Sequence, residues 1–320
     1  MRVLVTGVAG FVGSNFVLKA EAKGIDSLGI DNFNDTLYSS AIKDFNLRRI
    51  QSNTNKFKFL QRDCSNVDSR LVDEQGIDAV VHFAALPGQI KSWDRFSDYV
   101  NSNIISTERI LHAITNSRRK PKLILISTSS VYGELVTKDS RASGLHKPFS
   151  PYGVTKLAAE HLVDCYSKNF DLQYITLRLF SVFGPGQRPD MAISQFLNSL
   201  HNNRAIRVTG DGSQIRDFTF VEDVAEVVIA SLTSPQVGLA FDVAGGTSYS
   251  IKEVLALCAK ITKRVPIVEF SNKDIGDQSS TKGDTEDAKK YLGLKATVNL
   301  ERGIELQNEY FMKRVKSIGE

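Results

Sequence analysis

The sequence predicts an α/β protein built on a doubly wound parallel sheet, with a smaller C-terminal α/β lobe. Apolar, strand-like runs alternate with helical patterns through the first 180 residues, which is typical of a parallel sheet with helices on both faces. A glycine-rich turn follows the first run, where such sheets bind phosphates. With 320 residues, the chain is long enough to form a large core and two lobes.

The turn after the first predicted strand reads Thr-Gly-Val-Ala-Gly-Phe-Val-Gly over residues 6–13. Gly7 permits a tight turn, Gly10 lets backbone N–H groups approach a pyrophosphate, and Gly13 lets the next helix pack on the strand. The free N–H groups at the start of that helix face the anion. Glycine turns are common, so the motif gains its weight from the strand before it and the helix after it. It predicts a Rossmann-type, dinucleotide-binding fold.

An acidic residue ends the second predicted strand. Asp31 lies 21 positions after Gly10, where a carboxylate accepts a hydrogen bond from a ribose 2′-hydroxyl. A carboxylate repels a 2′-phosphate and no arginine follows directly, so NAD is favoured over NADP. Asp63 follows the third strand, where it either contacts the adenine or simply caps the strand end.

The remaining elements of the first half follow the same alternation. Ligands bind beyond the carboxyl ends of such strands, and the glycine turn, Asp31, Asp63, Ala84 and Ser127 all fall there. Five separate stretches therefore point to one crevice. The predicted strands are 2–6, 25–31, 57–60, 78–84, 122–128 and 173–180, and the predicted helices are 14–23, 67–75, 98–117 and 152–169.

The character of the chain changes after residue 180. A glycine- and proline-rich loop at 184–189 comes first, and the polar stretch 271–285 is predicted to be a surface loop. Helices are predicted at 191–202, 222–234, 251–263 and 301–315, with short strands at 205–208, 240–243 and 266–270. We assign residues 1–180, with 217–245 returning to them, to an NAD-binding domain, and residues 181–216 and 246–320 to a substrate lobe.

Composition excludes several other classes of function. The net charge is only +4 with dispersed basic residues, so nucleic-acid binding has no support. The cysteines Cys64, Cys165 and Cys258 lie far apart, which indicates reduced thiols and a cytoplasmic location. The histidines show no metal-ligand spacing, and no apolar run approaches the length of a membrane span. From these two observations we expect no metal and no membrane partner. The chain enters a strand at once, so no signal peptide is expected.

A tyrosine and a lysine lie four positions apart on one predicted helix face. Pro151 suits the first turn of a helix, and Tyr152 and Lys156 then share a face. An ammonium group beside a phenol lowers the phenol pKa from about 10, which would give a base that works near neutral pH. The same spacing also occurs often without function. Its weight comes from the hydroxyl groups of residues 127–130, which end a strand and can bind a sugar oxygen.

Together these motifs resemble the extended short-chain dehydrogenase/reductase family, specifically its NAD-dependent nucleotide-sugar epimerases. The resemblance covers nearly the whole chain. It rests on residues 6–13, Asp31, Asn32, His82–Ala85, Ser127–Gly133, Tyr152, Lys156, Arg178–Phe180, Gly184, Pro185, Arg216–Phe218, Val221, Asp223 and Val224. It implies tightly held NAD, a nucleoside diphosphate sugar in the C-terminal lobe, and a homodimer formed through helices 98–117 and 152–169.

The resemblance also assigns roles to individual residues. Tyr152 takes the proton of the sugar 4-hydroxyl while hydride leaves C4 for NAD, Lys156 supports the phenolate, and Thr128 holds the oxygen of a transient 4-keto sugar. The expected cofactor-binding residues are Gly7, Gly10, Phe11, Val12, Gly13, Asp31, Asn32, Phe33, Asp63, Cys64, Phe83, Ala84, Ala85, Asn103, Ser127, Tyr152, Lys156 and Phe180. The expected substrate-binding residues are Pro87, Ser129, Ser130, Ser181, Arg188, Gln195 and Arg216.

Two stretches, 31–35 and 186–192, resemble the UDP-glucuronate 4-epimerases within that family. In that subgroup the loop arginine, here Arg188, reaches the sugar carboxylate. A guanidinium group matches a carboxylate with two charge-assisted hydrogen bonds, which a lysine does not reproduce. The expected reaction is therefore the conversion of UDP-glucuronate to UDP-galacturonate. The alternative interpretation of Arg188 is an ordinary surface arginine.

Related activities fit the sequence less well. UDP-glucuronate decarboxylases usually carry glutamate at the position of Ser130, and 4,6-dehydratases carry Asp-Glu at Ser129 and Ser130. A UDP-glucose/UDP-galactose 4-epimerase is the nearest alternative, and Arg188 argues against it. An NAD-binding regulator without catalysis is a further alternative, against which the intact Tyr152, Lys156 and Thr128 argue.

The chain departs from the subgroup pattern in three places. Residues 86–90 read Leu-Pro-Gly-Gln-Ile instead of Gln-Ala-Gly-Val-Arg, and Lys91 is the expected substitute for the missing arginine. Residues 272–277 lack the arginine that many relatives carry, and Ser181 replaces asparagine or threonine. Arg216 is expected either to bind a UDP phosphate or to pair with a neighbouring carboxylate.

Overall fold

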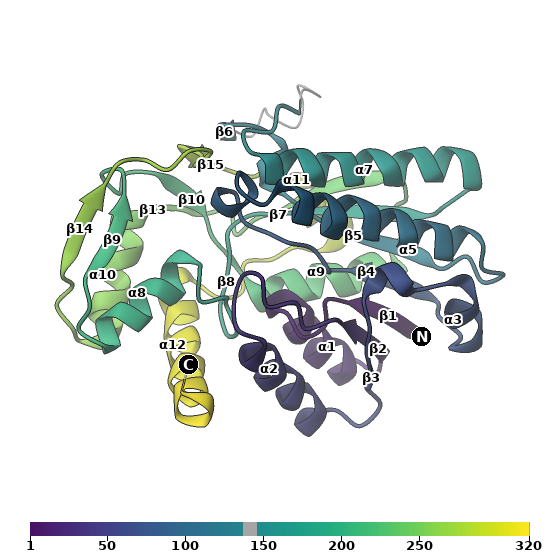
Figure 1. Ribbon diagram of the computed structural model, residues 1–320, viewed down its shortest axis with the longest axis horizontal. Coiled ribbons are helices and arrows are strands. Elements are labelled where there is room, and N and C mark those ends of the chain that lie inside the picture. The colour runs from purple at the N-terminus through teal and green to yellow at the C-terminus, as the bar shows by residue number, and fades with distance from the viewer. Residues whose placement is uncertain (137–145, 320) are drawn as a thin grey trace.

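Seven parallel strands form the central sheet of the computed structural model, which describes residues 1–136 and 146–319. Their spatial order is β12-β7-β5-β4-β1-β2-β3 (Figure 1). The strands are β1 (Arg2–Thr6), β2 (Asp26–Asp31), β3 (Lys58–Gln61), β4 (Ala79–His82), β5 (Lys122–Thr128), β7 (Tyr174–Leu179) and β12 (Leu239–Val243). The predicted doubly wound α/β fold is confirmed.

Helices cover both faces of this sheet, which explains its continuous apolar strands. On one face lie α1 (Phe11–Ala22), α2 (Ser40–Asn53), α9 (Val221–Thr233) and α11 (Glu286–Leu292), and on the other lie α3 (Ser69–Glu74), α5 (Ser106–Thr115) and α7 (Pro151–Phe170). Figure 1 shows α5 and α7 on the opposite side of the sheet from α1 and α9. Val3, Leu4 and Val5 of the central strand β1 are consequently fully buried.

The strand order reverses beside β1, and this reversal positions the site. The chain runs outward from β1 to β2 and β3, then returns to β4 on the other side of β1. In register, Thr6 pairs with Ile30 of β2 and with His82 of β4, so these three strands end at one edge. A crevice at such a reversal is where open α/β sheets bind ligands.

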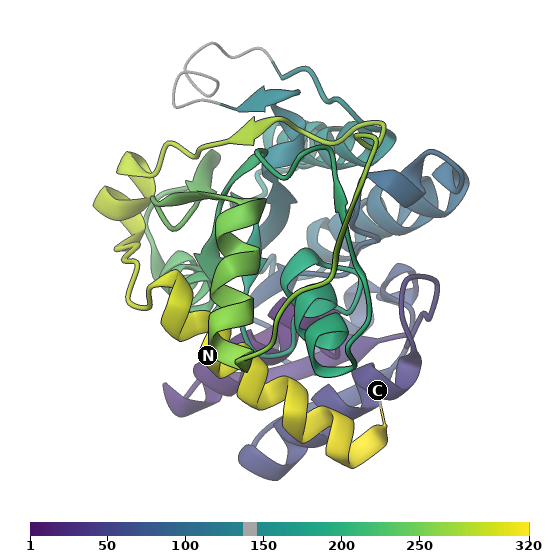
Figure 2. The same cartoon turned by 90° about the vertical axis from the view of Figure 1, so that its left-hand side faces the viewer.

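The C-terminal lobe has its own core and small sheets, one of which includes the short strand Leu135–Val136 from the first half of the chain. In the described part of the chain, one sheet has the order β13-β10-β15-β6, and two pairs join β11 to β8 and β14 to β9. These strands are β6 (Leu135–Val136), β8 (Val182–Phe183), β9 (Ile206–Thr209), β10 (Ile215–Asp217), β11 (Thr219–Phe220), β13 (Ser248–Ser250), β14 (Val268–Ser271) and β15 (Ser280–Thr281). Figure 2 shows α10 (Ile251–Thr262) beside α12 (Leu300–Ile318), and both pack with α8 (Ala192–His201) around Phe196 and Ile304.

The structure refines the predicted elements in several places. Helices α2 and α11 were not predicted, and neither were the short strands β8, β10, β11 and β13. The predicted helix 98–117 is a continuous helical segment composed of α4 (Phe96–Tyr99), a π-helical turn at Val100–Ile105, and α5. The predicted loop 271–285 contains the end of β14 and the short strand β15. Among the described residues, the structure contains no helix long and apolar enough to cross a membrane.

Candidate active site

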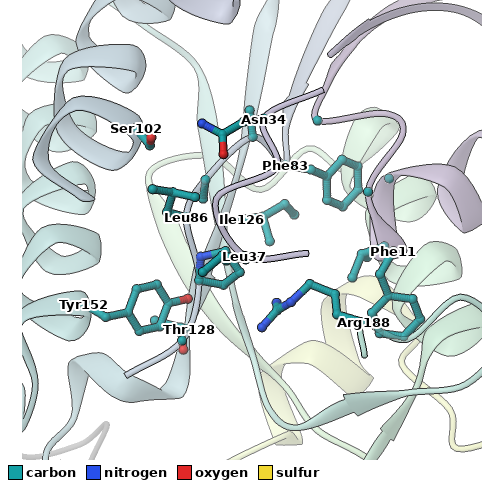
Figure 3. Close-up of a pocket in the computed structure, with 18 of the residues that line it drawn as sticks. Phe11, Asn34, Leu37, Phe83, Leu86, Ser102, Ile126, Thr128, Tyr152 and Arg188 are labelled. Atoms are coloured by element: carbon teal, nitrogen blue, oxygen red, sulfur yellow. The ribbon is translucent and has the colours of Figure 1, made fainter. Parts of the chain in front are cut away.

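A cavity of about 690 Å³ opens at the carboxyl ends of the central strands. Its wall combines residues that follow β1, β2, β4 and β5 with residues of the C-terminal lobe, including Arg188 and Gln195. Figure 3 shows side chains of both groups facing the same space. The wall contains every residue predicted for the cofactor and substrate except Phe33, Asn103, Ser129, Phe180 and Arg216. The expectation of one crevice is confirmed.

Close packing explains two of the glycines in the turn. Gly7 has a φ of +67°, and a Cβ there would lie 2.7 Å from the backbone nitrogen of Ala84. A Cβ at Gly13 would lie 2.5 Å from the carbonyl oxygen of Gly7. Both positions therefore require glycine for steric reasons. Helix α1 begins after Gly10 without a side-chain cap, so its first N–H groups remain available to an anion.

The carboxylate of Asp31 lies in the same cavity, directly beside the glycine turn. It accepts hydrogen bonds from the N–H groups of Ala9 at 3.1 Å and Phe33 at 2.8 Å, and Lys43 lies 3.6 Å away. The first of these contacts ties Asp31 to the glycine turn, so the two parts of the motif form one unit. Asp63 lines the cavity and also caps a short 3₁₀ turn through the N–H of Ser65, so it serves the capping role that was one of its alternatives.

The predicted catalytic residues meet on the floor of the cavity. Helix α7 begins at Pro151 because the Ser150 hydroxyl caps the N–H of Gly153 at 3.2 Å. Tyr152 and Lys156 follow one turn apart, and both are buried. Figure 3 shows the Tyr152 hydroxyl beside that of Thr128, at the end of β5. A phenol and an alcohol that lie side by side can bind the same substrate oxygen.

Burial dominates the ionisation of both α7 residues. It raises the pKa of Tyr152, while a hydrogen bond with Thr128 and the charge of Arg188 act in the lowering direction. The predicted lowering of the phenol pKa by Lys156 is therefore wrong for the chain by itself, because desolvation outweighs these charges. Burial also lowers the pKa of Lys156 to about 8, against the opposing charge of Glu160.

Arg188 enters the cavity from the wall opposite Tyr152 (Figure 3). Its Nε and Nη2 atoms contact the carboxylate oxygens of Asp190 at 2.9 and 3.0 Å. This two-pronged contact fixes the plane of the guanidinium group, whose remaining Nη1 has donors to offer. The charge of Arg188 also acts on Tyr152 across the cavity. A negatively charged ligand group between the two residues would therefore meet a fixed cation.

Three of the five residues outside the cavity wall support that wall. Asn103 is fully buried and binds the backbone N–H and carbonyl of Leu86 at 2.8 and 3.0 Å, which fixes the segment behind Pro87. Phe180 is fully buried in a small apolar cluster, and Ser129 lies in the buried turn between Thr128 and Ser130. Their geometry makes them supports for residues that face the cavity.

The other two residues outside the wall have partners within the chain. Phe33 donates its N–H to Asp31, and its ring packs edge-on against Phe59. Arg216 forms an ion pair with Asp277 at 2.6 Å, which is the second of its two predicted roles. Asp277 itself lines the cavity.

Several residues of the wall were missed by the sequence analysis. They are Tyr38, Lys43, Arg62, Gln89, Tyr99 and Asp190. Asp190 had a signal, because a carboxylate two positions after Arg188 can hold it. Gln89 lies in the segment 86–90, where the chain departs from the subgroup pattern, and no role was predicted for it. The remaining four belong to segments without a motif, and only the fold brings them to the cavity. Lys91, the expected substitute for an arginine, does line the cavity and contacts the carbonyl of Leu37 at 3.4 Å. The described residues contain no cluster suited to a metal ion.

Comparison with known proteins extends this description. The model of the "NAD dependent epimerase/dehydratase family" matches residues 3–244, about three quarters of the chain. The chain belongs to this family. The match begins in β1 and ends after β12, so it spans all seven strands of the central sheet.

Two members of this family are similar to the chain over nearly its full length. It is 35% identical to an uncharacterised UDP-glucose epimerase, YtcB, of Bacillus subtilis, with 95% of this chain and 96% of the relative aligned. It is also 35% identical to a UDP-glucuronate 4-epimerase of Thermodesulfobacterium geofontis, over 94% and 93% of the two chains. A crystal structure of UDP-glucuronic acid 4-epimerase from Bacillus cereus, with UDP-glucuronic acid and NAD, matches with 36% identity, a TM-score of 0.90 and coverage of 98% and 99%.

Proposed function

We propose that this protein is an NAD-dependent UDP-sugar 4-epimerase that converts UDP-glucuronate to UDP-galacturonate. The observation that carries the proposal is the arrangement of Tyr152, Thr128 and Arg188 around one cavity, which the glycine turn and Asp31 also line. Relatives with the same fold over the whole chain support it, since one has been crystallised with UDP-glucuronic acid and NAD.

The residues that line the cavity suit NAD. The pyrophosphate would lie on the uncapped N–H groups at the start of α1. Gly10 leaves room there, because a Cβ at this position would lie 3.1 Å from the carbonyl oxygen of Gly7. Asp31 is placed to accept the adenosine ribose hydroxyls, as the sequence predicted. When bound, NAD would supply reversible hydride transfer, and its oxidised ring would add a positive charge to the cavity that Tyr152 lines.

The residues of the chain supply the proton chemistry and the orientation. Tyr152 takes the proton of the sugar 4-hydroxyl and gives it back after the sugar has turned over. Thr128, whose hydroxyl lies beside that of Tyr152, holds the same oxygen. Lys156 contributes its positive charge one helical turn away. We assign NAD to residues 1–180 and 217–245 and the UDP-sugar to residues 181–216 and 246–320.

The choice of a uronate rests on Arg188. Its guanidinium group is rigidly oriented by Asp190 and faces Tyr152, so a carboxylate at C6 of the sugar can bind it. A UDP-glucose/UDP-galactose 4-epimerase is the second candidate, because Asp190 already neutralises Arg188 and one relative is described as a UDP-glucose epimerase. We further propose a cytoplasmic homodimer.

Product analysis tests the proposal directly. Purified protein is incubated with UDP-glucuronate, UDP-glucose or UDP-xylose, without added reductant, and the nucleotide sugars are separated. We expect UDP-galacturonate from the first substrate at a rate at least tenfold above the rates with the other two. Tyr152→Phe should reduce turnover by about 100-fold to 10,000-fold, the usual contribution of a general base. Failure to form any epimer, or undiminished turnover in Tyr152→Phe, would contradict the proposal.

A further inference from the structure

The segment of the C-terminal lobe that carries Arg188 forms a large part of the cavity wall. Arg188, Asp190, Met191, Ala192 and Gln195 all line the cavity. Arg188 takes its orientation from Asp190, which belongs to the same segment. This ion pair fixes the guanidinium group relative to the segment, so the position of the guanidinium group in the cavity depends on what holds the segment itself.

The amide of Gln187 closes this segment on itself. Its Nε2 donates to the carbonyl oxygen of Val182 at 3.1 Å, and its Oε1 accepts the N–H of Ser194 at 3.1 Å. A backbone carbonyl can only accept and a backbone N–H can only donate, so the orientation of the amide is determined. Gln187 is buried and directly precedes Arg188 in the chain. One side chain thus joins the parts of the segment before and after Arg188.

A second buried glutamine, Gln307 of α12, holds Gln187 from outside the segment. Its Nε2 donates to Oε1 of Gln187 at 2.7 Å and to Oγ of Ser194 at 3.1 Å. Its Oε1 accepts the N–H of Gly184 at 2.9 Å. The amide of Gln307 therefore contacts the segment at three points, on both sides of Arg188. Because an unpaired buried polar group costs free energy, these contacts oppose a displacement of the segment.

Helix α12 reaches these groups because Gly303 has no side chain. A Cβ at this position would lie 2.7 Å from Cζ of Phe183 in β8. The close approach of α12 to β8 places Gln307, one helical turn after Gly303, beside the N–H of Gly184. Ile304, which has no exposed surface, anchors α12 in the core of the lobe. The segment is thus attached to a helix whose own position is fixed by packing.

We propose that Gln307 is a positioning residue for substrate selection: by holding the segment 182–194, it places Arg188 where a sugar carboxylate can bind it. The inference rests on the proposed function, since it concerns the same uronate. A charge-assisted hydrogen bond is short and directional, so a displaced guanidinium group loses much of it. The hydroxymethyl group of UDP-glucose carries no charge, so its binding depends far less on where Arg188 lies.

The preference between two ligands tests the proposal. Dissociation constants for UDP-glucuronate and UDP-glucose are measured by calorimetry on NAD-loaded protein, in a parent that carries Tyr152→Phe so that the sugars are not converted. Gln307→Met removes the amide at similar side-chain length. It should bind UDP-glucuronate about threefold to tenfold more weakly than the parent and UDP-glucose within about twofold of it. The loss is partial because Asn15 of α1 still binds the carbonyl of Pro185 at 2.8 Å.

The effect must also depend on Arg188. In a protein that already carries Arg188→Ala, Gln307→Met should change the affinity for UDP-glucuronate by less than about twofold, because no guanidinium group is left to position. Ser194→Ala removes the hydroxyl that joins Gln307 to the carbonyl of Gln187, and it should weaken UDP-glucuronate binding by about threefold. This milder variant carries the test if Gln307→Met does not fold.

Asn308→Leu is the matched control. The amide of Asn308, also on α12, binds Nε2 of His201 at 2.7 Å. The variant therefore removes an amide contact between α12 and α8 without touching the segment 182–194. It should leave both dissociation constants within about twofold of the parent, whereas a purely structural role for Gln307 would weaken both ligands alike in Gln307→Met.

The outcomes separate the two proposals. If the parent binds UDP-glucuronate no more tightly than UDP-glucose, the proposed choice of a uronate fails, and this inference fails with it. If the parent prefers UDP-glucuronate and Gln307→Met keeps that preference, only the inference fails. An equal effect of Gln307→Met with and without Arg188, or the same loss of preference in Asn308→Leu, would also overturn only the inference.

Discussion

A uronate substrate is exposed to a side reaction, decarboxylation, that Arg188 is placed to suppress. In a 4-keto uronate the carboxylate is β to the ketone, so it can leave as carbon dioxide when its bond to C5 aligns with the carbonyl π system. A cation that binds the carboxylate and fixes its orientation prevents this alignment. The side chain of Arg188 is suited to this role because Asp190 holds its guanidinium plane with contacts of 2.9 and 3.0 Å.

Arg188→Ala should therefore have two effects. Affinity for UDP-glucuronate should fall by about tenfold to 100-fold, the effect of losing a charged hydrogen bond, while UDP-glucose should be affected less. The share of UDP-pentose among the products should rise. Calorimetry and product separation measure these changes. Arg188→Ala leaves the carboxylate of Asp190 unpaired, so the double variant Arg188→Ala/Asp190→Asn is the control. If both proteins keep the wild-type affinity for UDP-glucuronate and the wild-type share of UDP-pentose, Arg188 does not hold the carboxylate.

Lys156 gives the activity an alkaline limit. Burial lowers its pKa to about 8, and Glu160, one turn further along α7, opposes this shift. Above pH 8 the side chain loses the positive charge that favours the Tyr152 phenolate, so turnover should fall. Glu160→Gln removes the opposing charge, so the pKa of Lys156 falls further and the alkaline limb of the kcat profile moves to lower pH.

The measurement is the pH dependence of kcat for the wild type and Glu160→Gln. Glu160 also pairs with Arg178 at 2.6 Å, so the variant should unfold more easily, and kcat must be compared within the pH range where both proteins are folded. A purely structural role for Glu160 would lower stability without moving the limb. A limb that stays in place or moves upward would contradict the prediction.

Single residues were predictable from the sequence where chemistry and position coincide. Asp31 and Tyr152 belong to motifs whose members lie close together in the chain, and the fold only had to place them. Lys43 and Gln89 reach the cavity through tertiary contacts, to Asp31 and Gln278 respectively, that no local pattern encodes. The shift in the pKa of Tyr152 was predicted in the wrong direction for the same reason, since the sequence pattern showed the charge of Lys156 but not the extent of burial.

The elements of the central sheet were predictable because their apolar runs are long enough to recognise. Helix α2 did carry a signal, since its buried residues Ile42, Leu47 and Ile50 recur at helical spacing after the cap Ser39, but polar residues separate them. The two-residue strands β8, β11 and β15 are too short for any period to show. Their pairing depends on the lobe around them and not on their own sequence.

The packing of α1 against β1 depends on Gly13. A Cβ at this position would lie 2.5 Å from the Gly7 oxygen and 3.1 Å from Cα of Val8, both backbone atoms that cannot move aside. Gly13→Ala should therefore destabilise the protein by about 1–3 kcal/mol and weaken NAD binding through a displaced turn. Gly10→Ala, with one contact at 3.1 Å, should cost less stability. Thermal unfolding and NAD titration check this order, and equal stability of the two variants would contradict it.

Buried acidic residues connect distant parts of the whole molecule. Asp242 of β12 accepts hydrogen bonds from the Tyr132 hydroxyl and from the backbone of Asp284. Asp217 of β10 has no exposed surface and accepts the N–H groups of Gly246 at 2.9 Å and Gly283 at 3.4 Å. The contacts to Asp284, Gly246 and Gly283 join segment 217–245 to the C-terminal lobe, and the contact to Tyr132 joins it to the first half of the chain, so the shape of the cavity depends on them.

Asp217 makes the stability of the molecule depend on pH in an unusual direction. Burial raises its pKa to about 6 from an ordinary value of 3.8, although backbone N–H groups from Gly283 and Gly246 oppose the shift. Between these two pH values the folded state binds more protons than the unfolded state. The contribution of Asp217 to the free energy of unfolding therefore falls as the pH rises from 4 to 6, by roughly 2–3 kcal/mol.

Asp217→Asn removes this dependence, because an amide carries no charge at either pH. Any loss from replacing one carboxylate oxygen by NH₂ is the same at all pH values and cancels in the comparison. The free energy of unfolding of the variant relative to the wild type should therefore rise by about 2 kcal/mol between pH 4.5 and pH 7. Urea unfolding at the two pH values measures it. A constant difference between variant and wild type would show that Asp217 is already ionised in the folded protein at pH 4.5.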